Sequence, residues 1–145
     1  MTASAPGGPV DSPAPTDEPA PSASGPQVVV TIPSQFGDLR VRIDSNGLVV
    51  AGRPATNPEM NRIVLGERDI GVRNLADDRL LVVWEGTICE RSARLIVVPD
   101  ELFLAPDPRP GCDAMAVGWG LVLTTREPVD ASRMAARQGP TVLLP

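Results

Sequence analysis

Two cysteines are the first residues of this sequence whose type and spacing could do chemistry. Cys89 and Cys112 each stand in a turn-like flank beside an apolar run. They cannot build a closed structural zinc site, which usually needs four Cys or His ligands, because the chain has no histidine. Two possibilities remain, a disulfide or two separately buried thiols. A disulfide suits an extracellular β-domain and would stabilise it by roughly 3 kcal/mol in the chain-entropy model.

Carboxylates are the next candidates, because paired acids catalyse glycoside hydrolysis. Asp107 with Asp113, or Asp100 with Glu101, could form such a pair. In a small β-domain these acids are more often solvated loop residues. The absence of histidine and lysine from the sequence excludes the usual Ser–His–Asp and Cys–His mechanisms and lysine Schiff bases. No phosphate-binding or dinucleotide-binding glycine motif is present either. We therefore expect no enzyme and assign no catalytic residue.

The sequence also gives little indication that the chain binds metal ions, cofactors or nucleic acids. Acidic pairs such as Asp77 with Asp78 lack the D-x-D-x-D-G pattern of a calcium loop, so turn chemistry explains them better. We expect no metal and no cofactor. The net charge is -5 and the isoelectric point is about 4.6, which argues against phosphate binding. All thirteen basic residues are arginine, as the codon bias of a high-GC genome would produce.

The tryptophans could stack on a sugar ring. Trp84 lies in a run that is apolar at every position, which favours a core position. Trp119 alternates with Leu121 and Leu123, which again favours the core, but its flanking glycines would leave one ring face open. Trp119, together with the loop acids Asp107 and Asp113, is therefore the candidate for binding a glycan or another small ligand.

The elements that must position these residues are short strands. The run from Leu80 to Trp84 predicts a central strand buried on both faces. Further strands are expected at 28–32, 63–65, 70–75, 93–98, 101–104, 115–125 and 141–144, loops at 52–61 and 105–111, and one short helix within 129–137. This pattern indicates an all-β fold, an antiparallel β-sandwich that is Ig-like or a partly open barrel, with at most one short helix. The sandwich is preferred because no repeat supports barrel closure.

A hairpin with a defined register is expected around Asn46-Gly47. Both residues tolerate positive φ, as a type I′ turn requires. Leu39, Val41 and Ile43 alternate with polar residues, and a two-residue loop would place Ile43 opposite Val50.

Residues 1–27 differ in composition from the remainder. They are rich in Pro, Ala, Ser and Gly, which predicts a disordered tether ahead of a sandwich domain at 28–145. No apolar run approaches the roughly 18–20 residues that span a bilayer, and no signal-peptide pattern begins at Met1. We expect either a cytosolic protein or a chain whose export signal has been removed.

Three segments resemble secreted proteins and lipoproteins of high-GC Gram-positive bacteria. The segments are W-x-G-x-x-C at 84–89, R-P-G-C-D at 109–113 and G-x-G-x-V-L-T at 118–124. The resemblance covers about residues 80–130 and implies an exported, membrane-tethered β-domain without a defined activity. Membrane association would then come only through a removed or missing N-terminal anchor.

The sequence therefore predicts a non-catalytic extracytoplasmic module at the cell envelope, with a binding or structural role and an unknown envelope ligand or protein as its partner. A glycan or small-ligand binding module using Trp119 is the first alternative. A cell-wall hydrolase accessory or weak glycosidase is the second.

Overall fold

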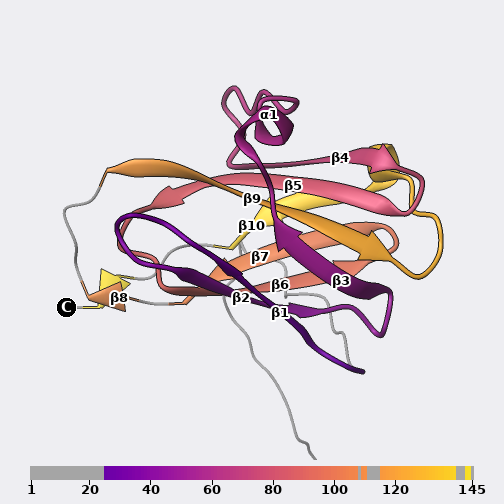
Figure 1. The fold of residues 1–145 in the computed structure, drawn as a ribbon, viewed down its shortest axis with the longest axis horizontal. Coiled ribbons are helices and arrows are strands. Elements are labelled where there is room, and N and C mark those ends of the chain that lie inside the picture. The colour runs from indigo at the N-terminus through magenta and orange to yellow at the C-terminus, as the bar shows by residue number, and fades with distance from the viewer. Residues whose placement is uncertain (1–24, 108, 111–114, 140–142, 145) are drawn as a thin grey trace, which may run out of the picture.

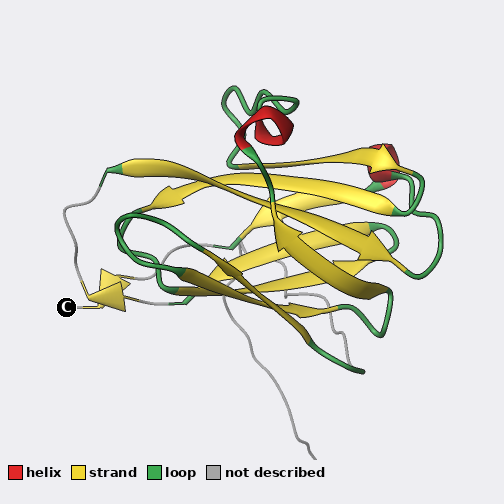
Figure 2. Ribbon diagram, viewed as in Figure 1, coloured by secondary structure: helices red, strands yellow, loops and turns green. Residues whose placement is uncertain are grey.

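The chain folds into two stacked β-sheets, as the computed structural model shows for residues 25–107, 109–110, 115–139 and 143–144 (Figures 1 and 2). The first sheet has the order β1 (Val28–Ile32), β2 (Leu39–Asp44), β6 (Ser92–Val98), β7 (Glu101–Pro106), β10 (Ala135–Gln138). The second has the order β3 (Val49–Pro54), β9 (Ala116–Thr125), β5 (Arg79–Thr87), β4 (Ile70–Ala76). A separate ladder joins β8 (Arg109–Pro110) to β11 (Leu143–Leu144). The expected all-β sandwich is confirmed.

Most neighbouring strands of the two sheets are antiparallel, but two pairs are parallel. β2 runs parallel to β6, and β7 runs parallel to β10. The chain can join parallel neighbours because it crosses to the second sheet between them. The β6–β7 pair is antiparallel around a turn at Pro99-Asp100.

The central position of β5 is confirmed and has a clear cause. Leu80, Val82 and Trp84 point into the main core between the sheets. Leu81 and Val83 point to the outer face, where α1 (Asn57–Met60) and the 61–69 loop cover them. Both faces of the strand are thus buried, which is why every position is apolar.

The Asn46-Gly47 turn is confirmed, but the hairpin it was expected to close does not form. Asn46 and Gly47 both have positive φ, and the Leu48 N–H donates to the Ser45 carbonyl oxygen. Beyond the turn the strands separate: β2 pairs with β1 and β6, while β3 pairs with β9 in the other sheet. The predicted pairing of Ile43 with Val50 is therefore wrong. The alternating pattern predicted correctly which face of β2 is buried, but it could not specify which strand lies beside β2.

Four local expectations are also corrected. Residues 63–65 form part of a loop over the outer face of β4 and β5, where Ile63 and Leu65 pack while Val64 stays 80% exposed. The expected 52–61 loop holds the end of β3 and the single turn of α1, which Thr56 caps. The expected 105–111 loop contains the end of β7 and β8.

The expected helix within 129–137 is the fourth correction. It is a 3-10 turn, Ala131–Arg133, followed by β10. Asp130 caps this turn, its side chain accepting from the Ser132 N–H. Val129 and Met134 bury their side chains in the main core, so tertiary packing decides the conformation here.

Nearly all of the expected 1–27 tether lies outside the described residues, and so does the expected strand start at Thr141. No helix among the described residues is long and apolar enough to cross a membrane.

Candidate functional site

Trp119 lies inside the sandwich. It is 4% exposed and stands opposite Trp84 in the β5–β9 register. The flanking glycines do not open its ring, because alternate residues of a strand project to opposite faces. A Cβ on Gly120 would lie 2.8 Å from Cγ of Met60, so the glycines make room for α1 on the outer face. The ring of Trp119 is not available to stack on a sugar.

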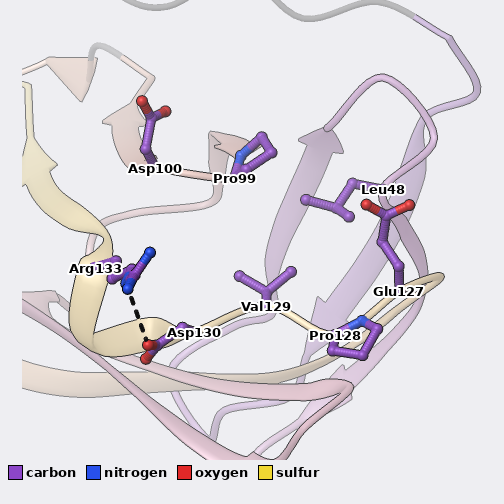
Figure 3. Close-up of a pocket in the computed structure, with 8 residues that line it drawn as sticks. All are labelled: Leu48, Pro99, Asp100, Glu127, Pro128, Val129, Asp130 and Arg133. Atoms are coloured by element: carbon purple, nitrogen blue, oxygen red, sulfur yellow. Dashed lines mark ion pairs between the residues drawn. The ribbon is translucent and has the colours of Figure 1, made fainter.

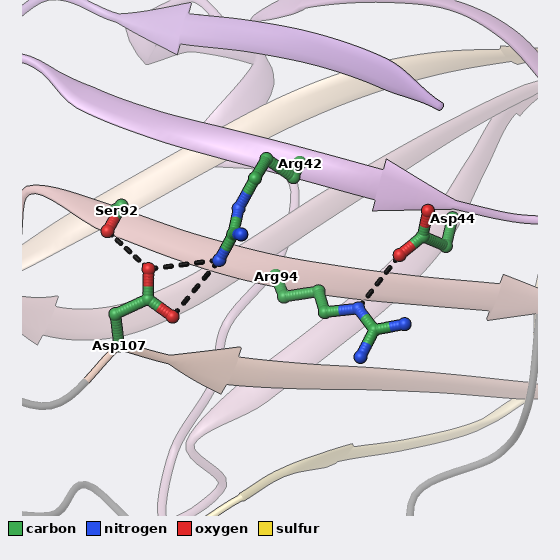
Figure 4. Close-up of polar contacts among 5 residues, drawn as sticks. All are labelled: Arg42, Asp44, Ser92, Arg94 and Asp107. Atoms are coloured by element: carbon green, nitrogen blue, oxygen red, sulfur yellow. Dashed lines mark hydrogen bonds and ion pairs between the residues drawn. The ribbon is translucent and has the colours of Figure 1, made fainter. Parts of the chain in front are cut away.

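Asp107 lies at the outer surface of the first sheet. Two Asp107 oxygens accept hydrogen bonds from Arg42 Nη2 at 3.1 and 3.0 Å, and the Ser92 hydroxyl donates to the same carboxylate (Figure 4). The structure therefore does not bring Asp107 together with the buried Trp119. Asp113 lies outside the described residues.

A second arginine–carboxylate pair lies beside the first. Arg94 Nε donates to Asp44 Oδ2 at 2.8 Å, and the Gln27 amide donates to Oδ1 (Figure 4). Burial alone would raise the pKa of Asp44, but these hydrogen bonds outweigh it and hold that pKa below its usual value. The Arg94–Asp44 pair links β6 to its neighbour β2, and Asp107, just after β7, links to Arg42 of β2 and Ser92 of β6, so the acids hold strands together.

The side chains of Asp100 and Glu101, the other expected acid pair, have different surroundings. Glu101 accepts a hydrogen bond from Arg137 Nε at 2.9 Å. Asp100 lines a shallow hollow at one end of the sandwich, with Glu127 and Asp130 (Figure 3). Arg133 reaches Asp130 at 3.7 Å there, and both side chains are largely exposed. None of the described residues that line this hollow is a buried polar residue.

Cys89 follows β5 and is 9% exposed. No free cysteine occurs among the described residues, which include Cys89. Cys112 lies outside them, so its pairing with Cys89 stays a prediction. The adjacent Glu90 is 4% exposed, and its Oε1 has no hydrogen-bond partner in the described part of the chain. Burial raises the pKa of Glu90, and a hydrogen bond with the Thr87 backbone offsets only part of that effect.

A recess whose lining residues are all uncharged lies beside the N-terminal half of β9; we call it the β9 groove. It forms because β3 leaves the sheet at Pro54 and the chain rises to α1, while β9 continues (Figure 1). Its lining consists of residues 32–36, Ala55, Asn57, Met60 and residues 117–120. Phe36, on the β1–β2 loop, is 40% exposed. The recess holds about 450 Å³.

The edge of β9 that faces this groove is open. Ile88 N–H donates to the Met115 carbonyl, so the odd-numbered residues of β9 bond on the β5 side. Ala55 N–H donates to the Gly120 carbonyl at 3.0 Å, so the even-numbered residues face the β3 side. Gly118 is the next even-numbered residue, beyond the end of β3. Its N–H and C=O therefore point into the groove, and neither has a hydrogen-bond partner among the described residues.

α1 forms the upper wall of the groove and is fixed locally. The Thr56 hydroxyl accepts from the Glu59 N–H, and the Glu59 carboxylate accepts from the Thr56 N–H, which is a capping box. Arg53, at the end of β3, donates to both oxygens of Glu59 at 2.9 and 2.7 Å. These bonds, with the Arg53 pair first, lower the pKa of Glu59 to about 2.

The comparisons with known proteins add no assignment: no protein-family model, curated protein or solved structure matches this chain. Within the described residues, no group of three or more His, Cys, Asp or Glu side chains could hold a metal ion.

The β9 groove was not among the sites expected from the sequence. Its available signals were Pro54, which ends a strand, and the T-x-x-E capping box at 56–59. Neither signal reveals that β3 pairs with β9, and without that pairing the open edge cannot be located.

Proposed function

We propose that this chain is a non-catalytic binding module that works outside the cytoplasm, tethered at the cell envelope. The observation that carries the binding role is the β9 groove. It combines an uncharged lining of apolar and polar residues, an exposed Phe36 and unpaired backbone groups at Gly118. Such a recess can bury part of a partner that carries apolar side chains.

The positions of the candidate acids support a non-catalytic role. Asp107 is engaged by Arg42 and Ser92, and Glu101 is engaged by Arg137. Both carboxylates thus stabilise the first sheet and lie away from the β9 groove. No observation favours the glycan-binding alternative, since Trp119 is buried.

The location outside the cytoplasm rests on two further proposals. One is the resemblance of residues 80–130 to exported proteins of high-GC Gram-positive bacteria. The other is a disulfide between Cys89 and Cys112, which an oxidising compartment would maintain. Burial of Cys89 beside the end of β5 suits such a bond.

The binding role is tested by panning a random peptide library against the immobilised full chain. Each selected peptide is then measured on the Phe36→Asp and Val64→Asp variants. Val64 is the matched control, since it is exposed and apolar but lies outside the groove. We expect Phe36→Asp to weaken binding at least about tenfold, because it replaces an exposed aromatic ring with a charge in an uncharged recess, and Val64→Asp to leave it unchanged.

Two results would contradict this proposal. One is a library from which nothing is enriched over a blank surface. The other is a set of peptides that bind both variants equally well. A glycan array probed with the same immobilised chain gives the competing outcome, in which a saccharide binds and peptides do not.

A further inference from the structure

We infer that the β9 groove binds its partner by strand addition: an extended, uncharged peptide segment of another protein pairs with the open edge of β9 at Gly118. This inference rests on the proposed binding role and names both the partner class and the mode of contact.

The first argument is the pair of unpaired backbone groups. Gly118 offers one donor and one acceptor on the same edge, as a strand in a ladder offers to its neighbour. Gly118 is solvent-exposed and Ala116, the next residue with the same orientation, is exposed too. An open edge of this kind is a template for another strand. β3 already occupies the C-terminal part of the same edge, from Leu121 to Thr125, so an added strand would continue an existing ladder.

The second argument is the pair of walls on either side of the open edge. Gly118 and Gly120 carry no side chain on the outer face, where Met60 of α1 lies over them. On the opposite wall, Phe36 is held in place, because its carbonyl oxygen accepts from Arg91 Nη2 at 2.7 Å. The partner would meet backbone along its edge and uncharged residues, Met60 and Phe36 among them, on the two walls.

The charge of the lining indicates the chemistry of the partner. None of the residues that line the groove is charged. A charged side chain seated there would lose hydration without gaining an opposite charge, so an uncharged segment is favoured. Small and β-branched residues suit an extended backbone in this position.

Two other possible occupants of the groove, a second copy of the chain and its own N-terminal segment, are less favourable than a free peptide. α1 and the β1–β2 loop flank the free half of β9 (Figure 1), so the edge of a second folded copy would meet these walls before it met Gly118. The chain's own N-terminal segment is rich in proline, which has no N–H to donate, and carries Asp11, Asp17 and Glu18. Both are poorer partners than an uncharged strand.

The test uses the ¹⁵N-labelled full chain and the synthetic peptide acetyl-Ser-Val-Thr-Val-Thr-Ser-amide. We expect saturable shifts of the Gly118 amide signal with a Kd of about 1 mM or below. The same peptide, N-methylated at its four central residues, should bind at least about tenfold more weakly, because methylation removes the donors that a ladder requires.

Two variants at one position provide the matched pair. Gly118→Pro removes the N–H, and proline is tolerated on a strand edge whose N–H faces away from the sheet. Binding of the peptide, followed at the amide signals of neighbouring residues, should weaken about tenfold. Gly118→Ala keeps the N–H, and its Cβ would lie 3.3 Å from the flexible Met60 Cε, so it should bind within about threefold of the parent.

Equal binding of the methylated and unmethylated peptides, or no shift at Gly118, overturns strand addition. If the selected peptides still depend on Phe36 in that case, the groove remains a binding site and only the mode of contact is wrong. A Gly118 signal that moves with protein concentration alone identifies a second copy as the occupant. A Gly118 signal that moves when residues 1–24 are removed identifies the N-terminal segment as the occupant of the groove.

Discussion

At the scale of single residues, Glu90 occupies a position that costs stability at neutral pH. It is buried, its Oε1 has no partner among the described residues, and its pKa is raised. Because the folded state favours the protonated form, the stabilising contribution of this group is fully present below its usual pKa, near 4.5, and is lost as pH rises through the folded pKa. Glu90→Gln removes the ionisation and should raise the free energy of unfolding by about 1 kcal/mol at pH 7.

The measurement is urea unfolding of Glu90→Gln and the parent between pH 3 and pH 8. The gain should vanish near pH 3 and grow above pH 4.5. Glu67→Gln is the control, because Glu67 is exposed. A gain that is the same at every pH would show that packing of the amide, rather than ionisation, causes it.

Among the elements, α1 depends on an ion pair that should be visible by titration. Arg53 donates to both oxygens of Glu59, and together with the Thr56 cap it lowers the pKa of Glu59 to about 2. In the Arg53→Ala variant the largest of these contributions is gone, so the pKa should rise toward 4.5, while the remaining Thr56 bonds keep it below that value.

Carbon-13 NMR of the Glu59 side-chain carboxyl, followed against pH, measures this change. Arg126→Ala is the control, because Arg126 is exposed and pairs with Glu127 instead. If the pKa of Glu59 stays near 2 without Arg53, the capping box alone holds α1 in place. The upper wall of the β9 groove would then not depend on β3.

The elements also show where prediction from sequence succeeds and where it stops. The β5 and β6 strands and the Asn46-Gly47 turn were predictable, because period and turn chemistry are local. The partner of β3 was not, since alternation specifies a buried face and leaves the neighbouring strand open. The same limit concealed the β9 groove. For Trp119, alternation gave the correct inward direction, while the inference drawn from its flanking glycines was wrong because those residues face α1.

At the scale of the whole molecule, the proposed disulfide joins the end of β5 to the segment just before β9. Adjacent strands β5 and β9 are already paired along their length, including Thr87 with Ala116. A bond between Cys89 and Cys112 would close a loop of the chain that contains β6, β7 and β8. It would lower the conformational entropy of the unfolded state while adding little stability to the β5–β9 ladder of the folded state. Its contribution should therefore appear in stability and leave the fold unchanged.

Intact mass after alkylation in denaturant, with and without reductant, tests the bond directly. We expect neither cysteine to react until reductant is added, and reduction to lower the melting temperature by about 10 °C, as a loss of about 3 kcal/mol implies for a domain of this size. The double variant Cys89→Ser with Cys112→Ser is the control, since its melting temperature should already be low and should not respond to reductant. Cysteines that alkylate on unfolding without reductant would contradict the bond. They would also remove the main physical argument for an oxidising compartment, and the β9 groove would then be tested against partners from inside the cell.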